Sequence, residues 1–377
     1  MRRSPTQASD KRSSSPAPPS RRRLLQGLLA LAPALAACAS RQQAGPASTS
    51  GTAPPAAPTS PPTPVPSPTP VPVNPLTGNV AVDPSLIHRR IVAVKIDNAP
   101  EARPPLGLGQ TDMVYEELAE GGLTRFIAMF LENQPDPVGP VRSARLTDIY
   151  LGEEWEWLLA YAGAGKTTSK LLADSLVPIF KAPELGEKLE GTPYFRDPKR
   201  AVPHNLFVHL QGIRDLAAQD SGIAPEVPIQ PFPFASPPDQ LGPIRTISLP
   251  YVPMAAVVWR YDEETNVWKR FMSGAPHVDG LDGRQITATN VVVQYARIFV
   301  ASNVEPDPAG NPVLDADIRG ENKLRVFHSG QMFEGTWYKE HDRAKTQYRL
   351  ADGSPMPFRP GRVWIHIVPE DFQARWS

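Results

Sequence analysis

Short apolar runs of β-strand length recur along the chain from residue 91 onward. Residues 91–96 form a β-branched run typical of a buried strand, and residues 123–132 carry apolar side chains on both faces, as a central strand does. Residues 112–120 alternate less regularly and predict a strand that passes into a turn at Gly121 and Gly122. These runs open the first predicted domain.

Longer segments follow these strands. Residues 147–158 predict a helix, residues 158–162 a short strand, and residues 166–176 a second helix after a glycine turn. A third helix is predicted from residue 213, ending at Gly222. We therefore expect residues 75–235 to form an α/β N-terminal domain with a mostly parallel or mixed sheet.

Prolines dominate residues 225–243, which predict a domain linker or a long connecting loop. Beyond this segment the pattern indicates strands. Residues 257–261 and 267–272 predict a hairpin, and three further runs are strand candidates. We expect residues 244–377 to form a smaller β-rich C-terminal domain. The three further runs are residues 290–300, 323–340 and 361–372.

The first 74 residues have a different character. Residues 1–38 read as an export signal, in which three arginines precede an apolar stretch that is too short to span a bilayer. Residues 20–25 (SRRRLL) also resemble a twin-arginine motif, so both Tat and Sec export remain open. Residues 39–74 are rich in Pro, Ser, Thr and Ala and predict a disordered, extended stalk.

Cys38 is the single cysteine of the 377 residues and follows Leu35, Ala36 and Ala37 as in a bacterial lipobox. A free structural cysteine is the alternative, but the position directly after an apolar signal favours lipidation. We therefore expect an extracytoplasmic protein that is lipid-anchored to the cell membrane through Cys38. A lone cysteine also excludes disulfides within the chain and a thiolate metal cluster.

The charge balance bears on the class of partner. Lys and Arg total 39 residues, as do Asp and Glu, so the formal net charge is +0. This balance argues against the broad basic surface that nucleic-acid binding requires, and we expect no nucleic-acid partner.

Residues 163–168 (GAGKTT) lie between a predicted strand and a predicted helix, where phosphate-binding loops occur. The full P-loop pattern requires a glycine at position 160, which is Ala160. A close-packed strand-to-helix turn is therefore the favoured interpretation.

The tryptophans and the hydrolase motifs also limit the possibilities. Trp259, Trp268, Trp337 and Trp364 favour a small aromatic core over a sugar-binding platform. The sequence holds neither a G-x-S-x-G nor an H-E-x-x-H motif, so the usual signatures of a serine hydrolase and a zinc protease are missing.

Several longer motifs carry a family resemblance. The chain resembles the DUF3048 proteins, the YerB-like bacterial lipoproteins, over most of residues 75–377. The resemblance implies a two-domain envelope lipoprotein and brings no agreed activity. The motifs are PLTG at 75–78, IDNAPEARPPLGL at 96–108, TDMVYEELAEGGLTRF at 111–126, GPVRSAR at 139–145, VPHNLF at 202–207, WRYDEETNVWKRFMSGAPHVD at 259–279 and GTWYK at 335–339.

A weaker similarity points to the LytR-CpsA-Psr phosphotransferases, which bind a polyprenyl pyrophosphate with a divalent metal. The Pro-Arg-Asp triplet of that family is absent here, with Ser-Ala-Arg at 143–145 in its place. Asp97 and Asp112 could share a Mg²⁺ or Mn²⁺ ion. Four arginines could then clamp a phosphate group; these are Arg103, Arg125, Arg142 and Arg145.

The alternative is that these acids and arginines pair with one another and order the loops beside the sheet. Pairing is the favoured interpretation for Glu116, Glu117 and Glu120, whereas for Arg142 and Arg145 both readings stay open.

Two hypotheses remain, and the sequence leaves open whether the protein is an enzyme. In the first, the chain is a non-enzymatic lipoprotein that binds a cell-envelope component such as peptidoglycan or another surface protein. In the second, the first domain binds or transfers a phosphate-bearing lipid or glycan, such as a polyprenyl phosphate, with a divalent metal.

Overall fold

The computed structural model describes residues 71–235, 241–307 and 310–377. The predicted export signal, the predicted lipidation site Cys38 and the predicted stalk up to residue 70 lie outside the described residues. None of the helices in the described part is long and apolar enough to cross a membrane.

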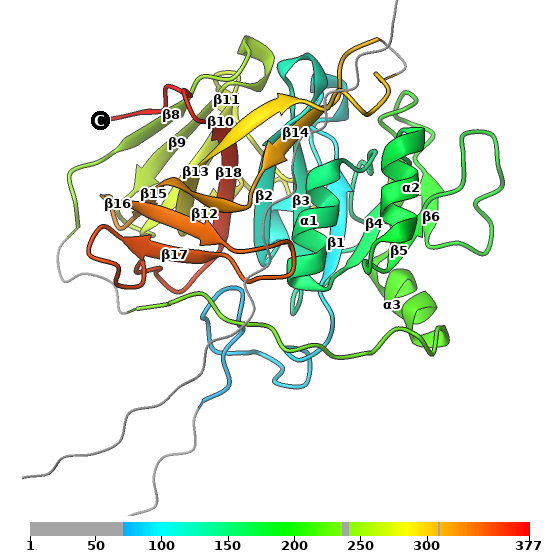
Figure 1. The fold of residues 1–377 in the computed structure, drawn as a ribbon, viewed down its shortest axis with the longest axis horizontal. Helices are drawn as coiled ribbons and strands as arrows, with labels where there is room; N and C mark the ends of the chain where they lie inside the picture. Colours follow the sequence, from blue (N-terminus) through cyan, green and yellow to red (C-terminus); the bar gives the residue numbers. More distant parts are fainter. Residues whose placement is uncertain (1–70, 236–240, 308–309) are drawn as a thin grey trace, which may run out of the picture. The chain divides into compact units, whose positions relative to one another are not determined.

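An eleven-stranded mixed sheet dominates the described residues, with strand order β17-β16-β15-β13-β18-β2-β3-β1-β4-β5 and β14 paired to β13 (Figure 1). Strands β1, β4 and β5 run parallel, as do β2, β18 and β13, while β3 and β15–β17 pair antiparallel with their neighbours. The bounds are β1 Val92–Ile96, β2 Met113–Leu118, β3 Thr124–Phe130, β4 Leu158–Tyr161, β5 Ile179–Lys181, β13 Asn290–Val300, β14 Leu314–Asp317, β15 Gly320–His328, β16 Gln331–Lys339, β17 Gln347–Leu350 and β18 Val363–Pro369.

Two smaller sheets complete the strand content of the described part. The six-stranded sheet has the order β11-β10-β9-β8-β19, with β12 paired to β10, and β6 pairs with β7 as a separate ribbon. Their bounds are β6 Tyr194–Arg196, β7 Leu206–Val208, β8 Thr246–Leu249, β9 Val257–Asp262, β10 Val267–Met272, β11 Ala275–Pro276, β12 Thr287–Ala288 and β19 Arg375–Trp376.

Successive residues of each strand point to opposite faces of the large sheet, so two hydrophobic clusters form, one on each face. One cluster joins Val94 and Phe126 to helix α3 (Leu210–Gln219) and to the six-stranded sheet. The other joins Ala93 and Ile127 to helices α1 (Leu146–Trp155) and α2 (Lys166–Asp174). Figure 1 shows α1 in front of strands β3 and β1, on one face of the large sheet. Burial on both faces explains why β1 and β3 are mostly apolar, and Lys95 of β1 is buried with carboxylate partners.

The fold class predicted from the sequence is confirmed. The first half holds helices and a mixed sheet, and the half beyond residue 246 is β-rich. The 323–340 run is a hairpin of β15 and β16 rather than one strand, because Ser329 and Gly330 turn the chain at positive φ. The third helix begins three residues earlier than predicted, at Leu210, and ends at Gln219.

The aromatic residues lie in the core, as the sequence favoured. Trp259, Trp268, Trp337 and Trp364 are each at most 1% exposed. Trp259 and Trp364 contact each other edge to face with ring centroids 5.2 Å apart. Buried rings of this kind stabilise the packing between the sheets and present no face for a sugar.

Candidate functional site

The end of strand β1 positions the first of the predicted site residues. Asp97 follows the last residue of β1, and the segment 140–142 pairs beside it. The Asp97 amide donates to the Pro140 carbonyl (2.9 Å), and the Arg142 amide donates to the Lys95 carbonyl (2.8 Å). These backbone bonds place Arg142 next to Asp97.

Asp97 is a buried carboxylate with three partners. Its Oδ2 lies 2.9 Å from Arg142 Nε and 2.7 Å from His204 Nδ1, and its Oδ1 accepts from the Ala99 amide (3.1 Å). Burial alone would raise the pKa of Asp97, but Arg142, the Ala99 amide and His204 outweigh burial and lower it. Asp97 is therefore ionised at neutral pH and orients His204.

Glu120 forms the second centre. Its Oε2 accepts from Arg145 Nη2 and lies 3.8 Å from Arg125 Nη2. Both arginines also donate to the Ser143 carbonyl, at 3.3 Å and 3.4 Å. Burial would raise the pKa of Glu120, but the bond to Arg145 and the charges of both arginines lower it overall.

Arg103 completes the group. Its Nη2 donates to the carbonyls of Asn98 (2.8 Å) and Met254 (2.7 Å), and no carboxylate of the described residues lies within ion-pair distance of it. Burial, followed by the nearby charge of Arg270, lowers the pKa of Arg103. We call Arg103, Arg125, Arg142 and Arg145, with Asp97 and Glu120, the arginine cluster.

Positive groups of the arginine cluster lie nearer the solvent than its acids do. The Arg142 side chain is 24% exposed and that of Arg125 14%, whereas those of Asp97 and Glu120 are 5% and 4% exposed. Burial, together with the charge of Arg145, lowers the pKa of Arg125 to about 10. Crowded guanidinium groups in front of buried carboxylates favour the approach of an anion.

Buried polar atoms without a hydrogen-bond partner gather at the same place. Such atoms are rare in folded proteins, and each calls for an explanation such as a water or a ligand. Within the described residues, five of them belong to the arginine cluster or its immediate neighbour: Asn98 Oδ1, Arg103 Nε, Glu120 Oε1, Arg142 Nε and Arg145 Nε.

Asp112 does not join this cluster, which corrects the idea that it shares a cation with Asp97. Met113 and Ala93 both pair with Met129, so Asp112 precedes its strand at one edge of the sheet while Asp97 follows its strand at the other. Asp112 is level with Val92, so Asp97 lies five residues further along the strand direction, which corresponds to roughly 16 Å.

The surroundings of Asp112 also explain it as a structural residue. It accepts from Asn74 Nδ2 (2.8 Å), the Leu131 amide (2.8 Å) and Asn133 Nδ2 (3.2 Å). Its pKa is raised overall, because burial outweighs these bonds. The described residues contain no group of three or more His, Cys, Asp or Glu side chains arranged to hold a metal ion.

Sequence reasoning missed a further polar centre, which lies between the eleven-stranded sheet and the six-stranded sheet. Glu116 accepts from both Arg270 Nη2 (3.0 Å) and Trp364 Nε1 (2.9 Å), and all three side chains are fully buried. The signal was present in β10, where Arg270 stands between Trp268 and Met272 on the buried face. Glu116 and Glu117 are thus paired acids, as the favoured interpretation held; Glu117 bonds Lys95.

Comparison with known proteins identifies the family. Residues 76–224 match the model of the "Protein of unknown function (DUF3048) N-terminal domain", and residues 247–365 match that of the DUF3048 C-terminal domain. The chain belongs to the DUF3048 family. It is 29% identical over 300 residues to the Bacillus subtilis (strain 168) protein named "Putative lipoprotein YerB", which covers 78% of this chain and 86% of that protein.

A solved structure is similar as well. The crystal structure of the YerB protein from Bacillus subtilis matches with a TM-score of 0.69 and 27% identity, covering 81% of this chain and 99% of that one. The arginine cluster lies within the DUF3048 N-terminal match, apart from the Met254 carbonyl that Arg103 contacts.

The two DUF3048 matches meet in one sheet. Strand β2 of the first pairs with β18, whose residues 363–365 close the second, and β18 pairs in turn with β13. The arginine cluster therefore rests on a sheet to which both regions contribute.

The glycine-rich GAGKTT segment of this DUF3048 chain is a turn between β4 and α2, as favoured from the sequence. Its helix N-terminus is occupied by a carboxylate, because the Thr167 amide donates to Glu305 Oε1 (2.8 Å). A carboxylate at this position accepts a hydrogen bond from a free backbone amide of the helix N-terminus and occupies the position that a phosphate would need.

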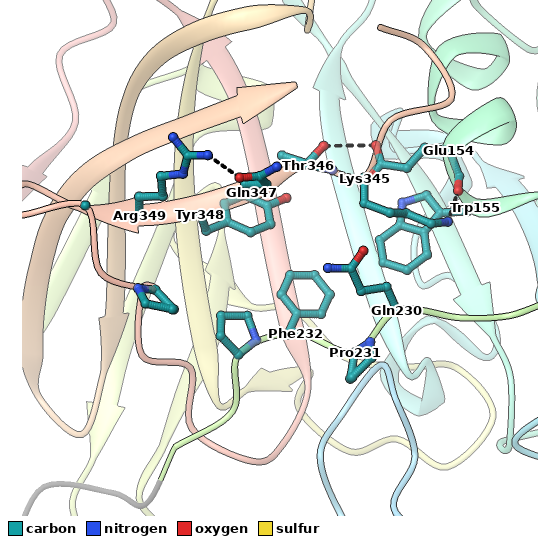
Figure 2. Close-up of a pocket in the computed structure, with 13 residues that line it drawn as sticks. Glu154, Trp155, Gln230, Pro231, Phe232, Lys345, Thr346, Gln347, Tyr348 and Arg349 are labelled. Atoms are coloured by element: carbon teal, nitrogen blue, oxygen red, sulfur yellow. Dashed lines mark hydrogen bonds between the residues drawn. The ribbon is translucent and has the colours of Figure 1, made fainter. Parts of the chain in front are cut away.

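A cleft of about 570 Å³ lies elsewhere, between α1, β17 and the proline-rich segment near residue 231. Figure 2 shows Trp155, Phe232 and Tyr348 along it, with Glu154 bonded to Thr346. Those rings are only 4–6% exposed. Both Glu154 oxygens are engaged, one by the Thr346 amide (2.8 Å) and the other by Lys339 (2.9 Å). The Glu154 carboxylate thus serves the fold. We regard the arginine cluster as the candidate site.

Proposed function

We propose that this protein is an extracytoplasmic, membrane-anchored lipoprotein that binds an anionic component of the cell envelope at the arginine cluster. The observation that carries the proposal is the arrangement of three arginines around two buried carboxylates, with unpartnered polar atoms among them and with Arg103 bonded to the carbonyl of the adjacent Asn98. Planar guanidinium groups match the oxygens of phosphate and carboxylate groups, which makes arginine the preferred residue for such ligands.

The envelope location rests on two supports. The chain carries a lipobox-like sequence ending at Cys38, and its relative YerB is named a lipoprotein. Fractionation of cells expressing the wild type and Cys38→Ala tests it. The wild type is expected in the membrane fraction and the variant outside it; a wild-type chain in the soluble fraction would contradict the anchor.

Calorimetric titration tests the binding. Full-length protein in detergent is titrated with a polyprenyl phosphate, and with the neutral polyprenol as the control ligand. We expect heat of binding for the phosphate alone, and its loss in Arg142→Ala. Arg375→Ala, which removes an exposed arginine from β19, is the matched control and should bind as the wild type does.

Each contrary outcome has a clear meaning. Equal binding of polyprenol would show that charge is not recognised, and unaltered binding by Arg142→Ala would move the site away from the cluster. Absence of binding to the polyprenyl phosphate, and to phosphate-bearing wall polymer in the same assay, would remove the proposal.

A further inference from the structure

We infer that the arginine cluster recognises the terminal phosphate of a phosphomonoester, a group with three free oxygens and two negative charges, and does so without a divalent cation. This inference rests on the proposed function and narrows its ligand class. Three features lead to it: the balance of contacting charges, the free donors of Arg142, and the pairing of both neighbouring carboxylates with arginines.

The charges in contact leave two arginines without an acid of their own. Arg142 pairs with Asp97 and Arg145 pairs with Glu120. Arg125 reaches Glu120 only at 3.8 Å, sharing an oxygen that Arg145 already holds, and Arg103 contacts backbone carbonyls alone. Uncompensated charge in a buried setting is costly, so an anion with two charges would stabilise this arrangement.

The neighbouring buried set of Lys95, Glu117 and Asp148 offsets at most one of those charges, because one lysine stands against two carboxylates. Lys95 lies between the two carboxylates, and the side chains of Lys95 and Asp148 are fully buried. Asp148 Oδ2 also accepts from the Arg145 amide (2.6 Å), and the set is buried, while Arg142 reaches the solvent.

Arg142 has the donors that a ligand needs. A guanidinium carries five N–H donors. No hydrogen bond from this side chain occurs among the described residues, and its Nε approaches Asp97 at 2.9 Å without hydrogen-bonding alignment. The Arg142 guanidinium is thus held in place by its ion pair with Asp97, while its N–H donors stay open for an oxyanion.

The number of guanidinium groups favours a phosphomonoester over other anions. Arg125, Arg142 and Arg145 are close enough for their charges to act on one another, as the lowered pKa of Arg125 shows. A carboxylate or a phosphodiester offers two free oxygens and one charge, so it would leave one guanidinium unmatched. The terminal phosphate of a monoester offers three oxygens and about two charges at neutral pH.

A divalent cation would find one carboxylate oxygen without a partner here, with guanidinium groups beside it. Asp97 Oδ2 faces both Arg142 and His204, and Asp97 Oδ1 holds the Ala99 amide. Glu120 keeps one oxygen, Oε1, without a partner, and Arg125 and Arg145 flank its other oxygen. Mg²⁺ prefers one or two carboxylates with several waters and is repelled by adjacent guanidinium groups.

Titration with small probes tests the ligand class. Full-length protein in detergent is titrated at pH 8 with glycerol 3-phosphate, with diglyceryl phosphodiester and with acetate, each in EDTA and again in Mg²⁺. We expect the monoester to bind about tenfold or more tightly than the diester or acetate, equally in EDTA and in Mg²⁺. Vesicles with phosphatidic acid, compared with phosphatidylglycerol, distinguish a lipid source from a soluble or glycan-borne phosphate.

Variants of Arg142 test whether the monoester binds at the arginine cluster. Arg142→Ala should weaken monoester binding by about tenfold to a hundredfold, and Arg142→Lys should recover only part of it, because lysine keeps the charge and loses the fork. Arg375→Ala is the control, and thermal unfolding of each variant checks that it is folded.

The outcomes separate this inference from the proposed function. Equal affinity for monoester and diester, or binding that requires Mg²⁺, would overturn the inference while leaving anion binding in place. No binding of any anionic probe, in solution or on vesicles, would overturn both.

Discussion

Arg270 is a buried arginine that joins distant parts of the chain at a single point. It pairs with Glu116, 154 positions away, and its guanidinium lies over the rings of Trp364 (4.8 Å) and Trp259 (5.4 Å). Such a pair contributes little net stability while intact, but removal of one member leaves a buried charge alone. Arg270 therefore fixes how the six-stranded sheet is placed against the large sheet, and the intact pair adds little to the free energy of unfolding.

Replacement of Arg270 tests this view. Arg270→Ala should lower the free energy of unfolding by about 3–5 kcal/mol, because Glu116 would keep an uncompensated charge in the core. Denaturant titration followed by tryptophan fluorescence measures the change. Glu116→Gln combined with Arg270→Met should recover much of the loss. Arg284→Ala is the control, since its side chain is 86% exposed, and it should change stability by less than about 0.5 kcal/mol.

Asp97 predicts a pH effect at the candidate site. Its pKa in the folded protein is lower than the ordinary value of 3.8, so its stabilising contribution is complete above that pH and is lost as the pH falls through the folded pKa. Asp97→Asn should be less stable than the wild type by about 1–3 kcal/mol at pH 6. That difference should shrink below pH 4; a constant difference down to pH 2 would contradict the ion-pair role.

At the scale of the elements, the outer strand β17 depends on a glycine in its neighbour. Gly335 of β16 pairs with Leu350, and a Cβ added there would lie 1.9 Å from the Arg349 carbonyl oxygen and 2.7 Å from Met356. Only a residue without a side chain allows the two backbones to approach so closely.

Gly335→Ala should therefore push β17 away from β16 and destabilise the protein by about 1–3 kcal/mol. Hydrogen exchange should become faster at residues 347–350 and stay unchanged at β1. Gly163→Ala is a matched control, because nothing lies within 4 Å of the added Cβ. Unchanged exchange in β17 would show that the strand adjusts at no cost.

At the scale of the whole molecule, the large sheet crosses the boundary between the two DUF3048 matches. Strand β2 has β3 on one side and β18 on the other, so the first region alone would expose an apolar sheet edge. Glu116 would also lose Arg270 and Trp364.

Residues 71–240 and 241–377, produced separately, should each fail to unfold cooperatively. Open edges and uncovered apolar faces lead to aggregation rather than to a stable domain. Circular dichroism with thermal unfolding measures this, and the fragment 71–377 is the control. A sharp transition in either half would show that it folds independently.

The sequence predicts local structure well and contacts between distant segments poorly. Periodicity gives β1, β3, the β9–β10 hairpin and α2 because those signals lie within a few residues of each other. It carries no information that His204 reaches Asp97 from 107 positions away. The separation of Asp97 from Asp112 follows from strand direction, which the apolar pattern does not encode.

The central place of β18 has a consequence for the time at which the chain can fold. Residues 363–369 complete the sheet between β2 and β13, so the core cannot close until nearly the whole chain has been synthesised. At synthesis rates of about 5–20 residues per second, tens of seconds pass before that strand is available. Until then β2 and β13 have no strand between them, so the complete core forms only when synthesis is almost finished.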